Sequence, residues 1–325
     1  MHELSDPKLR TLTQMNTYPD SWPQQFPYPT WYLDAVSGSA GWDYIRVDDA
    51  EGNLQGLLPF QLRRRWGLRF LTSPPLSPRL GPWIRYPKQE QTEQQKLAYL
   101  HRVLTALDEA LPEADYYRIS WPYELTYGMP WQMRGWQQRL RYSYVLPLEK
   151  ATTQLWKALK PSLRNKIRKG EKSLRIESSD DWQLLFQLVD EVFLYRNVSR
   201  QLAIDQVKDL HQAARQQKAC QLWLVYDEAG NPHAALWLYY DQTTAYNLLL
   251  GSDPAMRQSG AVPFLLWHAI RWAKEQGLRY FDFEGSHLPG VEPFFRSFGA
   301  EAWPYNEFVK GKKWLLAFRQ FMGKP

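Results

Sequence analysis

The chain has 325 residues, of which 44% are hydrophobic, enough for a large core in one big domain or two ordinary ones. Its 40 basic and 34 acidic residues leave a net charge of +6, a milder balance than the dense basic clustering of dedicated nucleic-acid-binding proteins. The single cysteine, Cys220, excludes an internal disulfide, and no run approaches the roughly 18 apolar residues of a membrane span.

The first predicted elements form a β-hairpin. Residues 44–47 and 54–62 have strand patterns and are separated by a Gly-Asn turn. A third extended piece follows at 71–84. A helix is then predicted over 92–111, where leucines recur at three- and four-residue steps, and a strand over 116–121. The first part of the chain therefore predicts the order β-β-β-α-β.

A helical segment spans residues 151–175. Pro161 divides it, because proline disfavours helix at the residue before it and fits the first turn of a new helix. The second piece carries Arg164, Arg168, Lys172 and Arg175 in one basic stripe. Such a stripe is typical of a solvated face, and binding of an anion is the alternative.

The order β-β-β-α-β recurs in the second part of the chain. Val225 begins a stretch that resembles the one from Val47, including its Gly-Asn turn, and a helix and a strand follow in the same order as before. We therefore predict a duplicated α/β (α+β) fold, with mixed sheets and packed helices. Its two halves are residues 1–148 and 149–325.

Two acidic residues lie in the last predicted strand, 279–285. Residues two apart in a strand point to the same side, so Asp282 and Glu284 are expected to share one face, with Phe281 and Phe283 on the other. Two carboxylates on one face of a core strand need either fixed hydrogen-bond partners or a function.

Three segments together resemble the FemAB-type branch of the GNAT acyltransferase superfamily. They are LWKALKPSLRNKIRKGEK, VPFLLWHAIRWAKEQGLRYFDFEGS and PGVEPFFRSFGAE. The likeness covers most of the second half and reaches the first half only through its order of elements. It implies a tandem GNAT-like (acyl-CoA N-acyltransferase) fold with a degenerate N-terminal domain. It also implies transfer of an acyl or aminoacyl group to an amine, from an acyl-CoA or from an aminoacyl-tRNA.

The resemblance points to a donor-binding loop before the predicted helix at 262–276. The residues that resemble the first part of the superfamily's R-x-x-G-x-G/A signature are Arg257, Gln258, Ser259, Gly260 and Ala261. Val262 replaces the last small residue, and Pro263 removes one N–H donor. A plain loop capped by Ser259 is the alternative. The matching loop of the first half, 73–82, is rich in proline and is expected to bind no second donor.

Direct transfer needs a group that accepts the proton of the attacking amine. We expect Glu284 to face the acceptor and Asp282 to be mainly structural, because Asp282 lies deeper in the strand. His287, just past the strand, is the alternative base, and a surface histidine is the other interpretation of it. Cys220 is expected to be a core residue on a strand.

Three functions fit these features. An acyl-CoA-dependent N-acyltransferase is favoured by the loop from Arg257 to Ala261. An aminoacyl-tRNA-dependent transferase acting on a peptidoglycan precursor is favoured by the basic stripe, and a non-catalytic binding or assembly protein by Val262 and Pro263. We expect acyl-CoA as co-substrate, an amine from a small molecule or a cell-envelope precursor, no covalently bound cofactor, no metal and a cytoplasmic location. The oligomeric state is not predicted.

Overall fold

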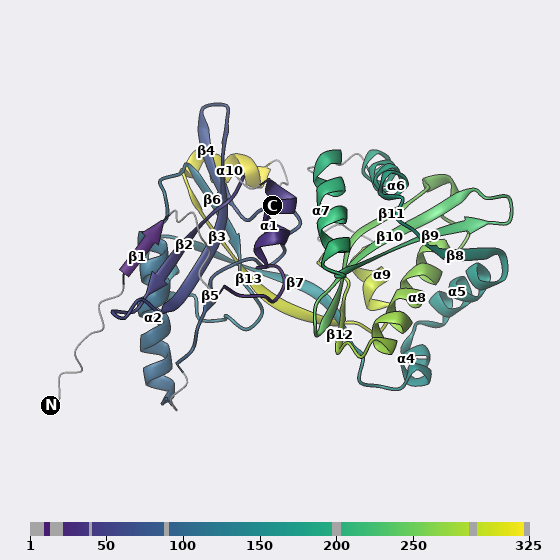
Figure 1. The fold of residues 1–325 in the computed structure, drawn as a ribbon, viewed down its shortest axis with the longest axis horizontal. Coiled ribbons are helices and arrows are strands. Elements are labelled where there is room, and N and C mark those ends of the chain that lie inside the picture. Colours follow the sequence, from purple (N-terminus) through teal and green to yellow (C-terminus); the bar gives the residue numbers. More distant parts are fainter. Residues whose placement is uncertain are drawn as a thin grey trace. The chain divides into compact units, whose positions relative to one another are not determined.

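The chain forms two compact units in a computed structural model that describes residues 10–13, 22–38, 41–87, 91–196, 203–285 and 291–321 (Figure 1). Unit 1 comprises residues 1–141 and 304–325, and unit 2 comprises residues 142–303. Among the described residues, no helix combines the length and the apolar character that a membrane crossing requires.

Unit 1 is a sheet with the strand order β1-β2-β3-β4-β6-β13, and β5 pairs with β3. Neighbouring strands are antiparallel except β4 and β6, which are parallel. The strands are β1 (Arg10–Thr13), β2 (Asp43–Asp48), β3 (Leu54–Arg65), β4 (Leu68–Thr72), β5 (Trp83–Ile84), β6 (Tyr116–Ser120) and β13 (Glu301–Gly311). The helices are α1 (Thr30–Ser37), α2 (Glu93–Glu109), α3 (Met129–Met133) and α10 (Lys313–Phe321).

The main core of unit 1 lies between the sheet and α2. The apolar face of α2 buries Val103, Leu104 and Leu107 against Ile45 and Leu58 of β2 and β3. The helix begins with a capping box, in which Thr92 and Gln95 satisfy each other's backbone N–H groups. The leucine spacing in the sequence therefore predicted the correct helix and most of its buried face, although Leu97, near its start, is exposed.

Unit 2 has the strand order β7-β12-β11-β10-β9-β8, in which β11 and β12 are parallel and the other pairs antiparallel. The strands are β7 (Gln137–Pro147), β8 (Leu174–Ser178), β9 (Cys220–Asp227), β10 (Pro232–Tyr240), β11 (Thr244–Ser252) and β12 (Tyr280–Asp282). The helical elements are α4 (Thr152–Ala158), α5 (Pro161–Ser173), α6 (Trp182–Tyr195), α7 (Ile204–Gln216), the 3-10 turn η1 (Pro254–Met256), α8 (Ala261–Glu275) and α9 (Glu292–Arg296).

Helices cover both faces of the sheet of unit 2. Helices α4, α5, α8 and α9 share one large core with β7, β9, β10 and β12, while α6 packs on β10 and β11 and α7 packs on β9 (Figure 1). Helix α5 begins at Pro161, as predicted. Cys220 is buried on β9, where burial raises the pKa of its thiol to about 12, so it is a core residue and not a thiolate nucleophile.

The two units repeat one another, which confirms the predicted duplication. The strand series β1-β2-β3-β4-β6 and β8-β9-β10-β11-β12 have the same pattern of antiparallel and parallel pairs. The hairpin turns also match in detail. Asp49 accepts a 2.8 Å hydrogen bond from the backbone N–H of Asn53, and Asp227 accepts one of the same length from Asn231. Val47 and Val225 lie in the strands that enter these turns.

The sixth strand of each sheet comes from the other part of the chain. Along the sequence, β7 follows the first β-β-β-α-β series, yet it pairs with β12, and β13 follows the second series, yet it pairs with β6. Residues 304–325 therefore belong to unit 1, and the boundary between the units lies after Arg141. This division differs from the expected one after residue 148, because the sequence pattern does not report which sheet a strand joins.

Candidate active site

The parallel strands β11 and β12 separate after three paired positions. Thr244, Ala245 and Tyr246 pair with Tyr280, Phe281 and Asp282, and then β12 ends while β11 continues to Ser252. At the point of separation, the amide Nδ2 of Asn247 donates a 3.3 Å hydrogen bond to the carbonyl of Phe283. Asn247 is buried, and its Oδ1 has no hydrogen-bond partner within the described part of the chain.

Asp282 fastens the end of β12. Its side chain is buried, with 1% exposure, and its Oδ1 accepts hydrogen bonds from Ser143 Oγ at 2.6 Å and from the backbone N–H of Glu284 at 2.9 Å. A buried carboxylate is tolerated when donors of this kind satisfy it. These contacts fit the structural role expected for Asp282, and that role stays a prediction.

Glu284 does not continue the strand. Its φ of +61° is in the left-handed region, so the chain turns at this residue, and the expectation that Asp282 and Glu284 share one strand face is wrong. The cause is the bond from the Glu284 N–H to Asp282, which closes a turn where the pattern predicted a longer strand. Glu284 is half-buried at this turn. His287 lies outside the described residues.

Phe283 is buried with Phe281 in the core of unit 2, and their rings meet edge to face at 4.9 Å. The backbone N–H of Phe283 also donates to Tyr144 of β7 at 2.9 Å. The turn that carries Glu284 therefore begins directly after a residue that is held in the core.

The expected donor loop joins β11 to α8. Gly260 has a φ of +86° and precedes the first residue of α8, and Ser259 Oγ accepts a 3.2 Å hydrogen bond from Ala261 N–H. Arg257 donates a 2.6 Å hydrogen bond to the hydroxyl of Tyr195, and its guanidinium lies 4.9 Å from the centre of that ring. The loop therefore presents a cation held in place by Tyr195. The first N–H group of α8, that of Ala261, already donates to Ser259.

Helix α5 lies against this loop. A Cβ on Gly260 would overlap the carbonyl oxygen of Lys166, and a Cβ on Gly170 would lie 2.7 Å from Cβ of Phe264. Lys169 Nζ donates a 2.5 Å hydrogen bond to the carbonyl of Gln258. The close contact of the two helices thus places a second cation at the loop.

The residues of the basic stripe, for which anion binding was the alternative to a solvated face, differ in their surroundings. Arg175 lies in β8 and not on the helix where it was expected. Arg168 is exposed and lies 5.5 Å from the centre of the Trp156 ring, with a 3.4 Å hydrogen bond to Asn165. Arg164 is half-buried and Lys172 is exposed. The structure joins α5 to the donor loop through Lys169, which lies outside this stripe.

Sequence reasoning did not single out Ser143, Asn247 or Lys169. Asn247 is a polar residue beside three consecutive leucines of β11, and that contrast was the available signal. Ser143 lies in β7, whose first half is polar, so the sequence does not distinguish it. Lys169 is one of several lysines on its helix, and only the packing of α5 against α8 distinguishes it.

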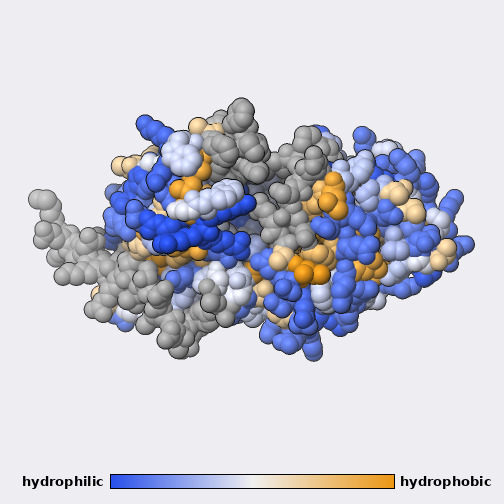
Figure 2. Space-filling model, turned by 90° about the horizontal axis from the view of Figure 1, so that it is seen from above, coloured by the Kyte–Doolittle hydropathy of each residue, from blue (hydrophilic) through white to orange (hydrophobic). Residues whose placement is uncertain are grey.

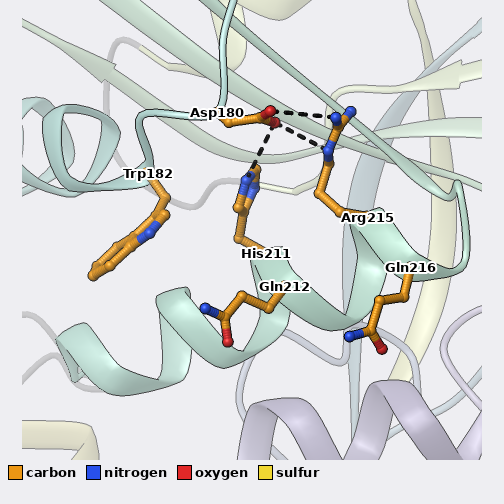
Figure 3. Close-up of a pocket in the computed structure, with 6 residues that line it drawn as sticks. All are labelled: Asp180, Trp182, His211, Gln212, Arg215 and Gln216. Atoms are coloured by element: carbon orange, nitrogen blue, oxygen red, sulfur yellow. Dashed lines mark hydrogen bonds and ion pairs between the residues drawn. The ribbon is translucent and has the colours of Figure 1, made fainter.

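A shallow groove in unit 2 is lined by residues of α7 and by Asp180 and Trp182 (Figure 3). Asp180 lies between His211, with Oδ1 3.6 Å from Nε2, and Arg215, with Oδ1 3.0 Å from Nε. Trp237 Nε1–H donates to Nδ1 of His211 at 3.2 Å, so the neutral ring carries its proton on Nε2, facing Asp180.

This histidine makes a testable contribution to the pH dependence of stability. Burial lowers the pKa of His211 below its ordinary value, an effect that Asp180 partly opposes. The unfolded chain then binds more protons just below about pH 6.5, so the contribution of neutral His211 is present above that pH and is lost as the pH falls. We expect the difference in free energy of unfolding between the parent and His211→Gln to shrink from about pH 8 to about pH 5.5. Urea unfolding at each pH measures it, and parallel curves would contradict it.

Comparisons with known proteins agree on the fold. Residues 157–296 match the family model described as an acetyltransferase (GNAT) domain. No curated protein matches the sequence. The crystal structure of FemX superposes with a TM-score of 0.62 at 14% identity, over 88% of this chain and 93% of that one.

Two further solved structures resemble the whole chain. A tandem GNAT protein from the clavulanic acid biosynthesis pathway has a TM-score of 0.55 at 9% identity, over 93% of this chain and 98% of that one. The structure of L-PGS from Bacillus licheniformis has a TM-score of 0.53 at 13% identity, over 89% and 90%. At such identities the likeness shows the fold, and the fold is the predicted tandem GNAT fold.

Proposed function

We propose that this chain, which is a transferase of the GNAT fold, is an N-acyltransferase that passes an acyl group from an acyl-CoA directly to an amine. The observation that carries the proposal is the separation of β11 from β12 beside the start of α8. Beyond Tyr246 the backbone of β11 has lost β12 as its neighbour, so an extended donor can lie along this edge. The amine nitrogen attacks the thioester carbonyl, the C–S bond breaks, and the thiolate leaves while a base takes the amine proton.

Side chains supply most of the proposed binding of the donor phosphates. Ser259 occupies the N–H of Ala261, and Pro263 has none, so the first turn of α8 offers few amides. Arg257 and Lys169 carry positive charges at the same loop. The residues present therefore fit a phosphorylated donor through charge-assisted contacts more than through an amide cradle.

Glu284 is the proposed base for the acceptor. Its backbone is held through its own N–H, which donates to Asp282, and through the preceding residue, Phe283, which is buried in the core. A half-buried carboxylate at a fixed turn, at the open end of a strand, can accept a proton from an amine held beside β11. The buried Oδ1 of Asn247 is an acceptor that a bound ligand N–H would satisfy.

Replacing Arg257 with Ala tests the donor site. We expect the dissociation constant for acetyl-CoA, measured by isothermal titration calorimetry, to rise by about 10–100-fold, because a charge-assisted contact of about 1.5–3 kcal/mol is lost. Lys208→Ala, an exposed lysine on α7, is the charge-matched control and should leave the affinity unchanged. Equal acetyl-CoA affinity in the parent and Arg257→Ala would contradict the donor site. Lack of binding to any acyl-CoA by the parent would favour the non-catalytic alternative.

An aminoacyl-tRNA donor is the second candidate, and one observation favours it. The segment 157–172, at the end of α4 and along α5, holds seven basic residues and one acidic residue, a net charge equal to the +6 of the whole chain. Such a density suits a polyanion. The double variant Arg164→Ser, Lys172→Ser should then weaken tRNA binding and its salt dependence while leaving acetyl-CoA affinity unchanged, and the reverse result would favour the acyl-CoA donor.

A further inference from the structure

The tip of the β3–β4 hairpin exposes a large aromatic side chain. Trp66 is 77% exposed and Leu62 is 42% exposed. Of the 16 tryptophans, Trp66 and Trp314 are the two with more than half of their surface exposed. Figure 2 looks onto the end of this hairpin and shows strongly hydrophilic side chains beside paler ones there.

Trp66 lies in a conformation that tryptophan disfavours. Arg65 pairs with Leu68, which leaves Trp66 and Gly67 as a two-residue loop with φ values of 52° and 75°. Two positive φ values indicate a type I′ turn, in which Asn-Gly is the favoured pair and a bulky first residue is strained. Since Trp66 also buries little surface, it contributes little to the stability of the hairpin.

Positive charge surrounds this tryptophan. Arg63, Arg64 and Arg65 are exposed, and within the described ranges none of them forms an ion pair. The guanidinium of Arg65 lies 4.1 Å from the centre of the Trp66 ring. No acidic residue occurs between Gln61 and the end of β4. The hairpin therefore carries three cations without an ion pair, and one of them, Arg65, lies against the exposed ring.

Helix α10 also carries an exposed tryptophan next to basic residues. Leu315 and Leu316 pack with Leu68 and Phe70 of β4, so the helix lies against the hairpin. Trp314, on the same helix, is 57% exposed. No acidic residue follows Glu307 in the chain. Two neighbouring elements of unit 1 thus each present an exposed tryptophan beside basic residues.

We propose that this hairpin surface, formed by residues 62–66 and Trp314, docks on the surface of an anionic phospholipid membrane. Tryptophan prefers the boundary between headgroups and acyl chains, and arginines add attraction to anionic lipids. An RNA strand would instead stack its bases on open ring faces, but Arg65 covers one face of Trp66, and Leu62 offers no stacking surface. The inference is independent of the proposed catalytic function.

Binding to vesicles tests the proposal. The full chain should co-sediment with vesicles of equal parts phosphatidylglycerol and phosphatidylcholine and not with pure phosphatidylcholine, and about 1 M salt should release it. Trp66→Asn should weaken this partitioning by about tenfold, since the variant loses the aromatic side chain that would be buried in the membrane interface. The same variant should unfold at an equal or higher temperature than the parent, because asparagine suits the first position of the turn. A stabilising role for Trp66 predicts the opposite change.

A charge-matched pair of variants tests the arginines. Arg63→Gln, Arg64→Gln should reduce partitioning by about 30-fold, and Lys208→Gln, Lys218→Gln, which removes two charges from unit 2, should change it little. The proposal is overturned if both double variants bind as the parent does, or if pure phosphatidylcholine binds equally well. It is also overturned if Trp66→Asn weakens binding of RNA and not of vesicles.

Discussion

Glu284→Gln is expected to lower turnover by about 10²–10⁴-fold, the range that a general base contributes, while leaving the free energy of unfolding nearly unchanged. Glutamine keeps the size of the side chain and the hydrogen bond from the backbone N–H to Asp282, and it carries the same strain at a φ of +61°. Only the proton acceptor is lost. Release of thiol from acetyl-CoA in the presence of primary amines measures the turnover.

Asp282→Asn provides the contrast. Its amide keeps one acceptor oxygen for Ser143 and for the Glu284 N–H, but it loses the charge that strengthens both bonds in a buried site. The variant should lose stability, by about 1–3 kcal/mol, with an activity loss that follows the unfolded fraction. Parental activity in Glu284→Gln would end the assignment of Glu284 and leave His287 as the next candidate.

Gly260→Ala is expected to destabilise the protein by about 2–5 kcal/mol, one of the largest effects of a single methyl group in this chain. Two costs add. Alanine is strained at a φ of +86°, and its Cβ would overlap the carbonyl oxygen of Lys166, so α5 would have to move away from α8. The midpoint of urea unfolding measures the loss.

Gly277→Ala separates the two costs. Gly277 also has a positive φ, of +79°, but apart from its chain neighbours no atom of the described chain lies within 4 Å of its Cβ position. Its substitution should therefore cost only the backbone strain, about 1–2 kcal/mol. Equal losses in the two variants would show that the contact between α5 and α8 is loose, and the proposed donor loop would lose its support.

Periodicity and internal repetition sufficed to predict most of the fold. Helix α2 has its leucines on one face, and α5 begins at the proline that marks it. The turns at Asp49 and Asp227 carry the same Asp and Asn pair because each hairpin needs the same hydrogen bonds. Local patterns of this kind depend on nearby residues, so a single sequence contains them.

Features that depend on contacts between distant residues were not predictable. The pattern predicts strand at Glu284, where the chain turns, because the turn depends on a carboxylate that Ser143, far away in the chain, helps to hold in place. The role of Lys169 depends on the packing of two helices, and the pairing of β13 with β6 depends on chain topology. Alternation of apolar residues reports that a strand is buried and does not report which neighbour it finds.

Because β7 pairs with β12 and β13 pairs with β6, the chain topology also sets the order in which the two sheets can form during synthesis. Phe308 pairs with Ile119, about 190 residues earlier in the chain, so unit 1 lacks its sixth strand until the ribosome has made β13. Unit 2 has all its strands once residue 282 has emerged, because β7 precedes them. The part of the chain that is made first therefore finishes folding last, and until then β6 presents an open edge that a chaperone or a second nascent chain could bind.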